Sequence, residues 1–290
     1  MKKKNLLLIV LIAAVLAGYY GYRTMDLVRT DTQAPKIHMS GEIPQISVQD
    51  PRTALLQGIT AKDAADGDVT DSLVVESVTL LDSDGNLSVS YAAFDRSGNV
   101  AKAERNARYT DYEPPKFTCR APLLYPYLTN FDILSTVGAY DVIDGEIQHR
   151  VKATSTDENS IASLGIHQVI FQVTNSLGDT SRQTFPVEVY DPETYNAELS
   201  LKEYLIYLPR GSAFVPKNYL KTFVVKGEEV NLTAGMPRDY SLKTTGEVLT
   251  QNPGTYVVEF RLTYLERHET NPDLDKEFTG YSKMIVIVEE

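Results

Sequence analysis

The sequence predicts an all-β protein: a row of antiparallel β-sandwich domains behind a single N-terminal transmembrane helix. Three features support this fold class, namely an apolar N-terminal segment, an internal repeat of about 80 residues, and short strand-like runs bounded by turn residues. After residue 30 no long amphipathic helical pattern interrupts these runs. That absence favours a sandwich over a mixed α and β fold.

Residues 1–30 have the composition of a membrane anchor. Three lysines, Lys2 to Lys4, precede an apolar stretch over residues 6–22, whose length is at the short end of what spans a bilayer as a helix. Basic residues before the span place the N-terminus in the cytoplasm and the following domains outside the cell. The alternative is a secretory signal peptide, whose cleavage would release residues 31–290. Both interpretations put the body of the protein on the extracellular side.

Composition and charge limit the classes of partner. The chain carries a net charge of −11 although its N-terminal segment is basic, so residues 31–290 are strongly acidic. Such a surface repels nucleic acid, which is therefore not expected as a partner. The single cysteine, Cys119, excludes an internal disulfide. We expect Cys119 to pack as a small apolar residue rather than to react.

Two segments of the chain repeat each other. The matching positions are, in order, Asp31 and Asp111, Asp63 and Asp141, Asp66 and Asp144, Gly85 and Gly165, and Asp95 and Asn175. Matches in this order indicate a duplicated unit of about 80 residues. Residues 192–290 read as a third, diverged copy that lacks the acidic motif. The predicted organisation is an anchor over 1–30 and three domains over 31–111, 112–191 and 192–290.

Each unit has strand patterns rather than helical ones. Residues 87–91 and 167–173 alternate or run β-branched and aromatic, and clusters of Asp, Ser, Gly and Asn bound them. In the third unit, residues 252–260 have the same glycine-then-strand form, and residues 284–288 read as a closing strand. Short strands at this spacing are typical of antiparallel sandwiches.

The motifs of the first unit resemble a known family. The acidic motif at residues 61–69, Asp-Arg-Ser-Gly-Asn at 95–99 and Asp-Tyr-Glu-Pro-Pro at 111–115 look like the bacterial immunoglobulin-like repeat. That family occurs in tandem in Gram-positive surface proteins and in some insecticidal crystal toxins. The resemblance is strongest over 31–111 and weakest over 192–290. It implies immunoglobulin-like sandwiches and extracellular display, but no single function, because the module serves as a spacer, an adhesin part or a binding platform.

The acidic motifs are the candidate metal site. In the implied topology, the loop after the second strand and the loop before the last strand lie at the same end of a domain. This gathers, in the first domain, Asp31, Asp63, Asp66, Asp68 and Asp95 and, at the following joint, Asp111, Glu113, Asp141, Asp144 and Glu146. The candidate calcium ligands are Asp63, Asp66, Asp68, Asp111, Glu113, Asp141 and Asp144, because calcium binds clustered carboxylates and carbonyls. The alternative is that these residues hold turns through backbone amides, with Gly67 and Gly145 at positive φ. Apart from calcium, no cofactor is expected.

No pattern in the sequence indicates an enzyme. The four histidines are scattered, and no nucleophile or phosphate-binding motif is present. The predicted function is a non-catalytic, membrane-anchored bacterial cell-surface protein that acts as a stalk, adhesion or interaction module. Its protein or glycan partner is not specified by the sequence. The alternative is an accessory subunit of envelope or polysaccharide machinery that binds a glycan or a membrane partner.

Overall fold

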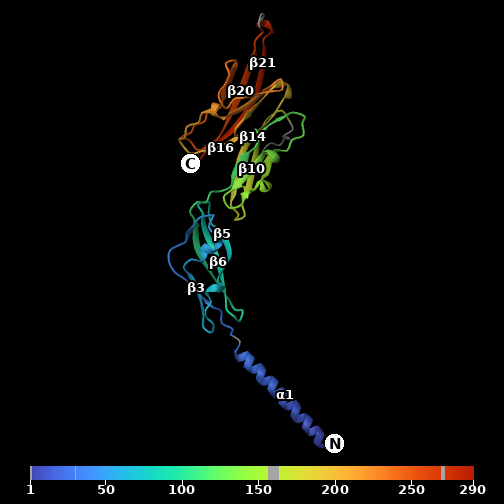
Figure 1. Cartoon of the computed structure of the whole chain (residues 1–290), viewed down its shortest axis with the longest axis vertical. Coiled ribbons are helices and arrows are strands. Elements are labelled where there is room, and N and C mark those ends of the chain that lie inside the picture. The colour runs from blue at the N-terminus through green and yellow to red at the C-terminus, as the bar shows by residue number, and fades with distance from the viewer. Residues whose placement is uncertain (1, 30, 156–162, 269–271) are drawn as a thin grey trace. The chain divides into compact units, whose positions relative to one another are not determined.

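The computed structural model describes residues 2–29, 31–155, 163–268 and 272–290 (Figure 1). The chain divides into two compact units, Met1–Tyr112 and Glu113–Glu290. After the N-terminal helix, the described elements are strands joined by turns, short 3-10 helices and one helix of four residues, α2 (Ile133–Thr136). The all-β prediction for the body of the protein is therefore confirmed.

Helix α1 spans Lys2–Arg29. Its leucine, isoleucine and alanine residues are compatible with a helix. In the part of α1 whose side chains are described, Val10, Leu11 and Val15 are more than half exposed. Among the described residues, no helix is both long and apolar enough to cross a membrane. Residues 1 and 30 of the predicted anchor segment lie outside the described residues.

The first sandwich has two sheets. Its first sheet has the order β1–β3–β4, with the bounds Lys36–Met39, Ile59–Asp63 and Gly67–Asp68. Its second sheet has the order β2–β7–β6–β5, with the bounds Gln45–Ile46, Val100–Tyr109, Asn86–Phe94 and Val74–Leu80. Alternate residues of β6 point inward, so Leu87, Val89 and Tyr91 are fully buried between the sheets. The buried Tyr91 hydroxyl donates to the carbonyl of Leu55 at 2.9 Å, which satisfies its polar end.

The second sandwich repeats this layout. One sheet has the order β8–β10–β11, with the bounds Lys116–Cys119, Val137–Asp141 and Gly145–Glu146. The other has the order β12–β13–β14–β9, with the bounds Lys152–Ser155, Gly165–Thr174, Thr180–Tyr190 and Leu124–Pro126. In both sandwiches a short early strand pairs in parallel with the last strand, β2 with β7 and β9 with β14. The duplication read from the sequence is thus a duplication of topology.

The remaining strands form one seven-stranded sheet. Its order is β18–β17–β15–β21–β20–β19, with β16 also paired to β21. The bounds are Glu228–Asn231, Leu220–Val225, Ala197–Leu201, Lys276–Val288, Gly254–Glu266 and Tyr240–Thr245, and β16 is Leu205–Leu208. Residues from β15, β17 and β20 share one core around Phe223 and Phe260, so the sheet curls on itself.

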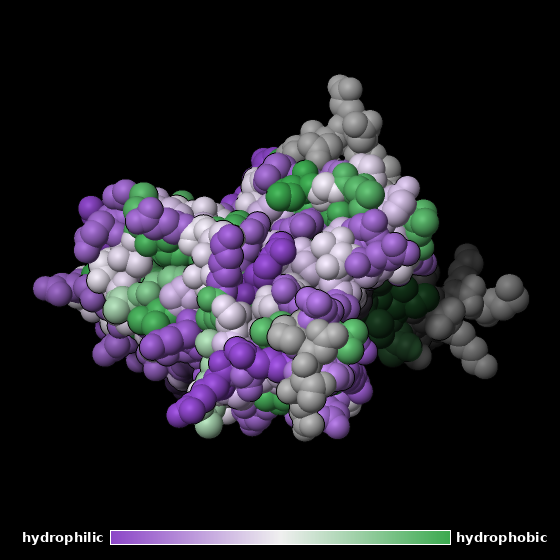
Figure 2. Space-filling model, turned by 90° about the horizontal axis from the view of Figure 1, so that it is seen from above, coloured by the Kyte–Doolittle hydropathy of each residue, from purple (hydrophilic) through white to green (hydrophobic). Residues whose placement is uncertain are grey.

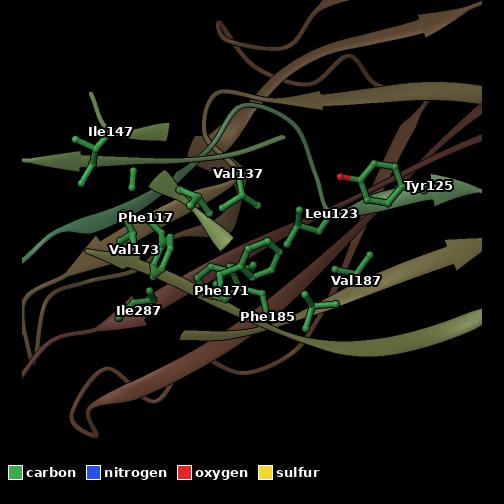
Figure 3. Packing of buried hydrophobic residues seen from close by; sticks show 14 residues of the cluster. Phe117, Leu123, Tyr125, Val137, Ile147, Phe171, Val173, Phe185, Val187 and Ile287 are labelled. Carbon is green, nitrogen blue, oxygen red and sulfur yellow. The ribbon is translucent and has the colours of Figure 1, made fainter. Parts of the chain in front are cut away.

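Strands β16 and β21 form a wall shared by two cores. Side chains alternate along a strand, and here Met284 and Val286 lie in the core around Phe260, whereas Ile285 and Ile287 lie in the core of the second sandwich. Figure 3 shows Ile287 close to Val173 and Phe117. The packing therefore crosses the boundary predicted at residue 191.

The same alternation holds in β16. Leu205 and Tyr207 pack against the second sandwich, whereas Ile206 and Leu208 pack in the curled sheet. The Tyr207 hydroxyl accepts a hydrogen bond from the backbone amide of Phe117 at 2.8 Å. Burial raises the pKa of Tyr207, so its hydroxyl remains protonated at neutral pH.

On the face shown in Figure 2, hydrophobic residues lie in small groups among hydrophilic ones. Scattered apolar groups of this kind are ordinary for a soluble surface. The apolar residues of the three clusters described above are instead gathered between the sheets.

Candidate metal site

Three acidic side chains from separate segments of the first sandwich meet at one end of it. Asp31 precedes β1, Asp63 is the last residue of β3, and Asp95 directly follows β6. One carboxylate oxygen of each lies within 4.8 Å of the other two. Within the described part of the chain, these are the acidic, histidine or cysteine side chains that gather closely enough to hold a metal ion.

The turn after β3 positions Asp63. Its Oδ1 accepts hydrogen bonds from the backbone amides of Ala65 at 2.7 Å and Asp66 at 3.0 Å, and Gly67 closes the turn at a φ of 76°. The amides of Asp66 and Ala65 hold the pKa of the Asp63 carboxyl below its usual value, because they stabilise the charged form. The predicted positive φ at Gly67, and its counterpart of 71° at Gly145, are confirmed.

The second oxygen of Asp63 has a different environment. Asp63 is only 8% exposed, and its Oδ2 is buried without a hydrogen-bond partner. Oδ2 of the half-buried Asp31 is in the same condition. Burying a carboxylate oxygen without a hydrogen-bond donor destabilises the folded state, because the oxygen loses its hydrogen bonds to water and forms none with the protein.

Asn99 fixes the other two members of the group. Its backbone amide donates to Asp95 Oδ1 at 2.8 Å, and its side-chain Nδ2 donates to Asp95 Oδ2 at 2.6 Å. The same Nδ2 lies 3.0 Å from the carbonyl oxygen of Asp31. Asn99 therefore ties the segment before β1 to the turn after β6.

Two further candidate ligands of the first motif lie outside the group. Asp66 Oδ2 accepts from the backbone amide of Arg96 at 2.8 Å. Asp68 Oδ1 accepts from the amide of Thr70 at 3.0 Å, and hydrogen bonds from the side chain and backbone of Thr70 hold the pKa of Asp68 below its usual value. Asp68 holds a local turn, as the alternative interpretation of the motif proposes, whereas the bond from Arg96 joins Asp66 to the turn after β6.

The candidate ligands around residue 112 also have partners of their own. Asp111 accepts from the Ser47 hydroxyl at 2.6 Å and from the Val48 amide at 2.8 Å. Glu113 forms an ion pair with Lys116 at 2.8 Å between carboxylate oxygen and Nζ. These interactions lie within the first unit for Asp111 and within the second unit for Glu113.

The second copy of the motif repeats the turn but not the acidic group. Asp141 Oδ1 accepts from the amides of Ile143 and Asp144, both at 2.9 Å, as Asp63 does in the first copy. Asn175 stands where the first copy has Asp95, and its Nδ2 donates to Asp141 Oδ2 at 3.1 Å. The oxygen that lacks a partner in the first copy is thus satisfied in the second.

Asp144 completes the second turn. Its Oδ2 accepts from the amide of Ser176 at 2.6 Å and from Arg150 Nη1 at 2.7 Å. Burial acts to raise the pKa of Asp144, but the hydrogen bonds from Ser176 and the charge of Arg150 outweigh it and lower the pKa. Asp144 is therefore an ionised, well-partnered carboxylate.

Sequence reasoning placed Asp31 and Asp95 at the same end as Asp63 but did not include them among the candidate ligands. The repeat offers a signal for Asp95, which aligns with Asn175. The two side chains have nearly the same shape, but only Asp95 is charged, so the charge at this position differs between the two copies. Asp31 has no such signal, because it aligns with another acid, Asp111.

The comparisons with known proteins give short or weak matches. No protein-family model matches the chain. A segment of 60 residues, 21% of the chain, is 43% identical to an uncharacterized 81.3 kDa protein of Acholeplasma phage L2 and covers 8% of that protein. The chain thus spans under a tenth of the length of the curated relative that it matches.

Among solved structures, CBM51-2 in complex with GlcNAc and the INT domains, from Clostridium perfringens ZmpB, are 15% identical to the chain. They cover 68% of this chain and 40% of their own, with a TM-score of 0.21. The EC22-24 segment of mouse cadherin-23 is 10% identical and covers 88% of this chain and 99% of its own, with a TM-score of 0.19. We draw no conclusion on function from likenesses at these TM-scores.

Proposed function

We propose that this chain is a non-catalytic bacterial surface protein of the immunoglobulin-like repeat type, which serves as a stalk or interaction module outside the cytoplasm. The proposal is supported by the duplicated sandwich, whose two copies share both their strand order and the hydrogen-bonded turns at Asp63 and Asp141. In both turns, backbone amides donate to one carboxylate oxygen, so these two acidic residues of the motif stabilise the turn in which they lie.

The observation that carries the stalk proposal is the wall formed by β16 and β21. A spacer must keep its ends apart, and loosely joined domains do so poorly because domain motion is the default when an interface is small. Here one strand supplies Ile285 and Ile287 to one core and Met284 and Val286 to the next. Bending at this joint would open two cores at once, so residues 113–290 should act as a single stiff segment.

The stiffness can be tested by electron paramagnetic resonance distance measurements between spin labels at Thr184 and Thr244, both exposed, in a Cys119→Ala background. A single narrow distance distribution is expected. The control pair, Gln172 and Thr184, lies within one sheet and defines the width that the labels alone produce. A distribution much broader than that of the control would contradict the stalk proposal.

We further propose that α1 holds the protein at a membrane. Support comes from the exposed apolar residues of its described part, since a helix that is hydrophobic on every side is normally buried in protein or lipid. Lys2, Lys3 and Lys4, at the start of α1 and before its apolar stretch, favour the cytoplasmic side for the N-terminus.

Membrane attachment and display can be measured on the full chain in a bacterial host. The protein should remain in the pellet after alkaline carbonate extraction, and protease added to intact spheroplasts should remove residues 31–290. The variant Ile12→Lys with Leu16→Lys should be released or retained in the cytoplasm, whereas Ile12→Leu should behave as the parent. A soluble parent chain that has lost its first residues would instead support a cleaved signal peptide.

A further inference from the structure

The group formed by Asp31, Asp63 and Asp95 carries more negative charge than the protein around it balances. Asp63 and Asp95 are each 8% exposed, and two carboxylate oxygens, Asp31 Oδ2 and Asp63 Oδ2, are buried without a donor. No ion pair is recorded for any of the three within the described residues. Buried carboxylates in this condition destabilise a fold unless a cation joins them.

The turn after β3 divides the two oxygens of the Asp63 carboxylate between different surroundings. The backbone amides of Asp66 and Ala65 donate to Oδ1. Oδ2, on the other side of the carboxylate, is buried and has no hydrogen-bond donor. A cation can serve as the partner of such an oxygen.

We propose that Asp31, Asp63 and Asp95 bind a divalent cation, and that the cation is calcium. Calcium is held by oxygen ligands at about 2.3–2.6 Å, so two ligands of the same ion are at most about 5 Å apart. The three oxygens here lie within 4.8 Å of one another, which fits that limit. Magnesium needs a tighter octahedron at about 2.0–2.1 Å and keeps more of its water, so it should bind more weakly.

The second copy of the repeat shows how the same turn is built without a cation. Asn175 replaces Asp95, removes one negative charge and donates from Nδ2 to Asp141 Oδ2. Asp111, the counterpart of Asp31, accepts from Ser47 and Val48 in the first sandwich. The first copy therefore brings three acids together, whereas the second has an amide in place of one of them, which donates to the matching oxygen.

Calcium at this site would join three segments that are far apart in the sequence. Asp31 lies two residues after the end of α1, whereas Asp63 is the last residue of β3 and Asp95 follows β6, a strand of the other sheet. The ion would fasten the chain at residue 31 to the end of the first sandwich, in addition to the hydrogen bond from Asn99. This inference does not depend on the proposed surface display, since it rests on the three side chains alone.

The test is isothermal titration of the chelator-treated full chain with calcium chloride, accompanied by thermal melts in EDTA and in calcium. We expect a single calcium site, a melting temperature that rises with calcium, and weaker binding of magnesium chloride. Asp95→Asn introduces the residue that the second sandwich has at this position, so it should fold and bind calcium about tenfold more weakly or worse.

Two further variants provide a second test of the ligands and a control. Asp31→Asn removes a ligand from a half-buried position outside the core and should also weaken binding, whereas Asp84→Asn, at an exposed position, should leave binding unchanged. The proposal is overturned if the parent takes up no calcium, or if Asp95→Asn and Asp31→Asn bind it as tightly as Asp84→Asn does.

Discussion

Lys283 and Glu188 form a buried ion pair between β21 and β14, with Nζ and Oε2 2.7 Å apart. The Lys283 side chain is 3% exposed and that of Glu188 is 18% exposed. The Tyr281 hydroxyl also donates to Glu188 Oε2, at 3.3 Å. The pair joins the curled sheet to the second sandwich, next to the wall that the two share.

Breaking this ion pair should destabilise the second unit. Lys283→Met leaves the Glu188 carboxylate buried without its cation, and removing one member of such a pair costs about 3–5 kcal/mol. Chemical denaturation of the full chain measures the decrease in the free energy of unfolding, in the transition that belongs to residues 113–290. Adding Glu188→Gln to Lys283→Met should recover most of it, since the uncompensated charge is then gone. A loss below about 1 kcal/mol would mean that the pair behaves like a surface salt bridge.

The shared wall predicts that two cores unfold together. Ile287→Ala opens a cavity in the core that contains Phe117, and Met284→Ala opens one in the core that contains Phe260, each at a cost of about 2–5 kcal/mol. In calorimetry, both variants should lower the midpoint temperature of the same unfolding transition. The exposed Leu249→Ala is the control and should shift it little. Two transitions, each sensitive to only one of the variants, would show that the cores are independent.

Asp111 should stabilise the first unit in a pH-dependent way. Hydrogen bonds from the Ser47 side chain and the Val48 amide lower its pKa from 3.8. A depressed folded-state pKa gives stability that is present above the unfolded value and lost as the pH falls through the folded value. Asp111→Ala should therefore melt below the parent at pH 7, with the difference becoming smaller as the pH falls below 3.8 and through the lower pKa of the folded state. A difference that does not shrink as the pH falls, or an equal effect of Asp84→Ala, would contradict this role.

Cys119 should be unreactive in the folded protein. It packs against the core of the second sandwich, and burial raises the pKa of its thiol to about 12. The thiolate is the nucleophile, so very little of it is present at pH 8. Iodoacetamide should label the native chain slowly and the chain in guanidinium quickly, as mass spectrometry can follow. Fast labelling of the native chain would mean that this part of the core opens readily.

The sequence predicted the parts of the fold that depend on local pattern. The repeat located the two matching turns, because an Asp followed three residues later by Asp-Gly makes the same hydrogen bonds in both copies, as Asp63 and Asp141 do. The packing of Cys119 as an apolar residue, expected from the sequence, is also confirmed. Topology then brought Asp31 and Asp95 to the same end as Asp63.

What pattern does not determine is the choice of partner. Asp66 and Asp68 belong to the same sequence motif as Asp63. Yet Asp66 accepts a hydrogen bond from the amide of Arg96, and Asp68 accepts one from the amide of Thr70. Similarly, residues 284–288 read as a buried strand, but an unbroken apolar run does not reveal that its two faces belong to different cores. The bond from Arg96 to Asp66 and the division of β21 between two cores both depend on contacts between distant segments.

The shared wall also determines when the second sandwich can be completed during synthesis. Phe117 and Val173 are made early, but Ile285 and Ile287, which close their core, are added much later. A ribosome builds a chain from its N-terminus, so residues 113–191 must wait with an open apolar side, whereas the first sandwich holds all of its core within residues 37–109. The nascent chain is most exposed to aggregation, and most in need of a chaperone, in the interval after residues 113–191 have been made and before Ile285 and Ile287 are added.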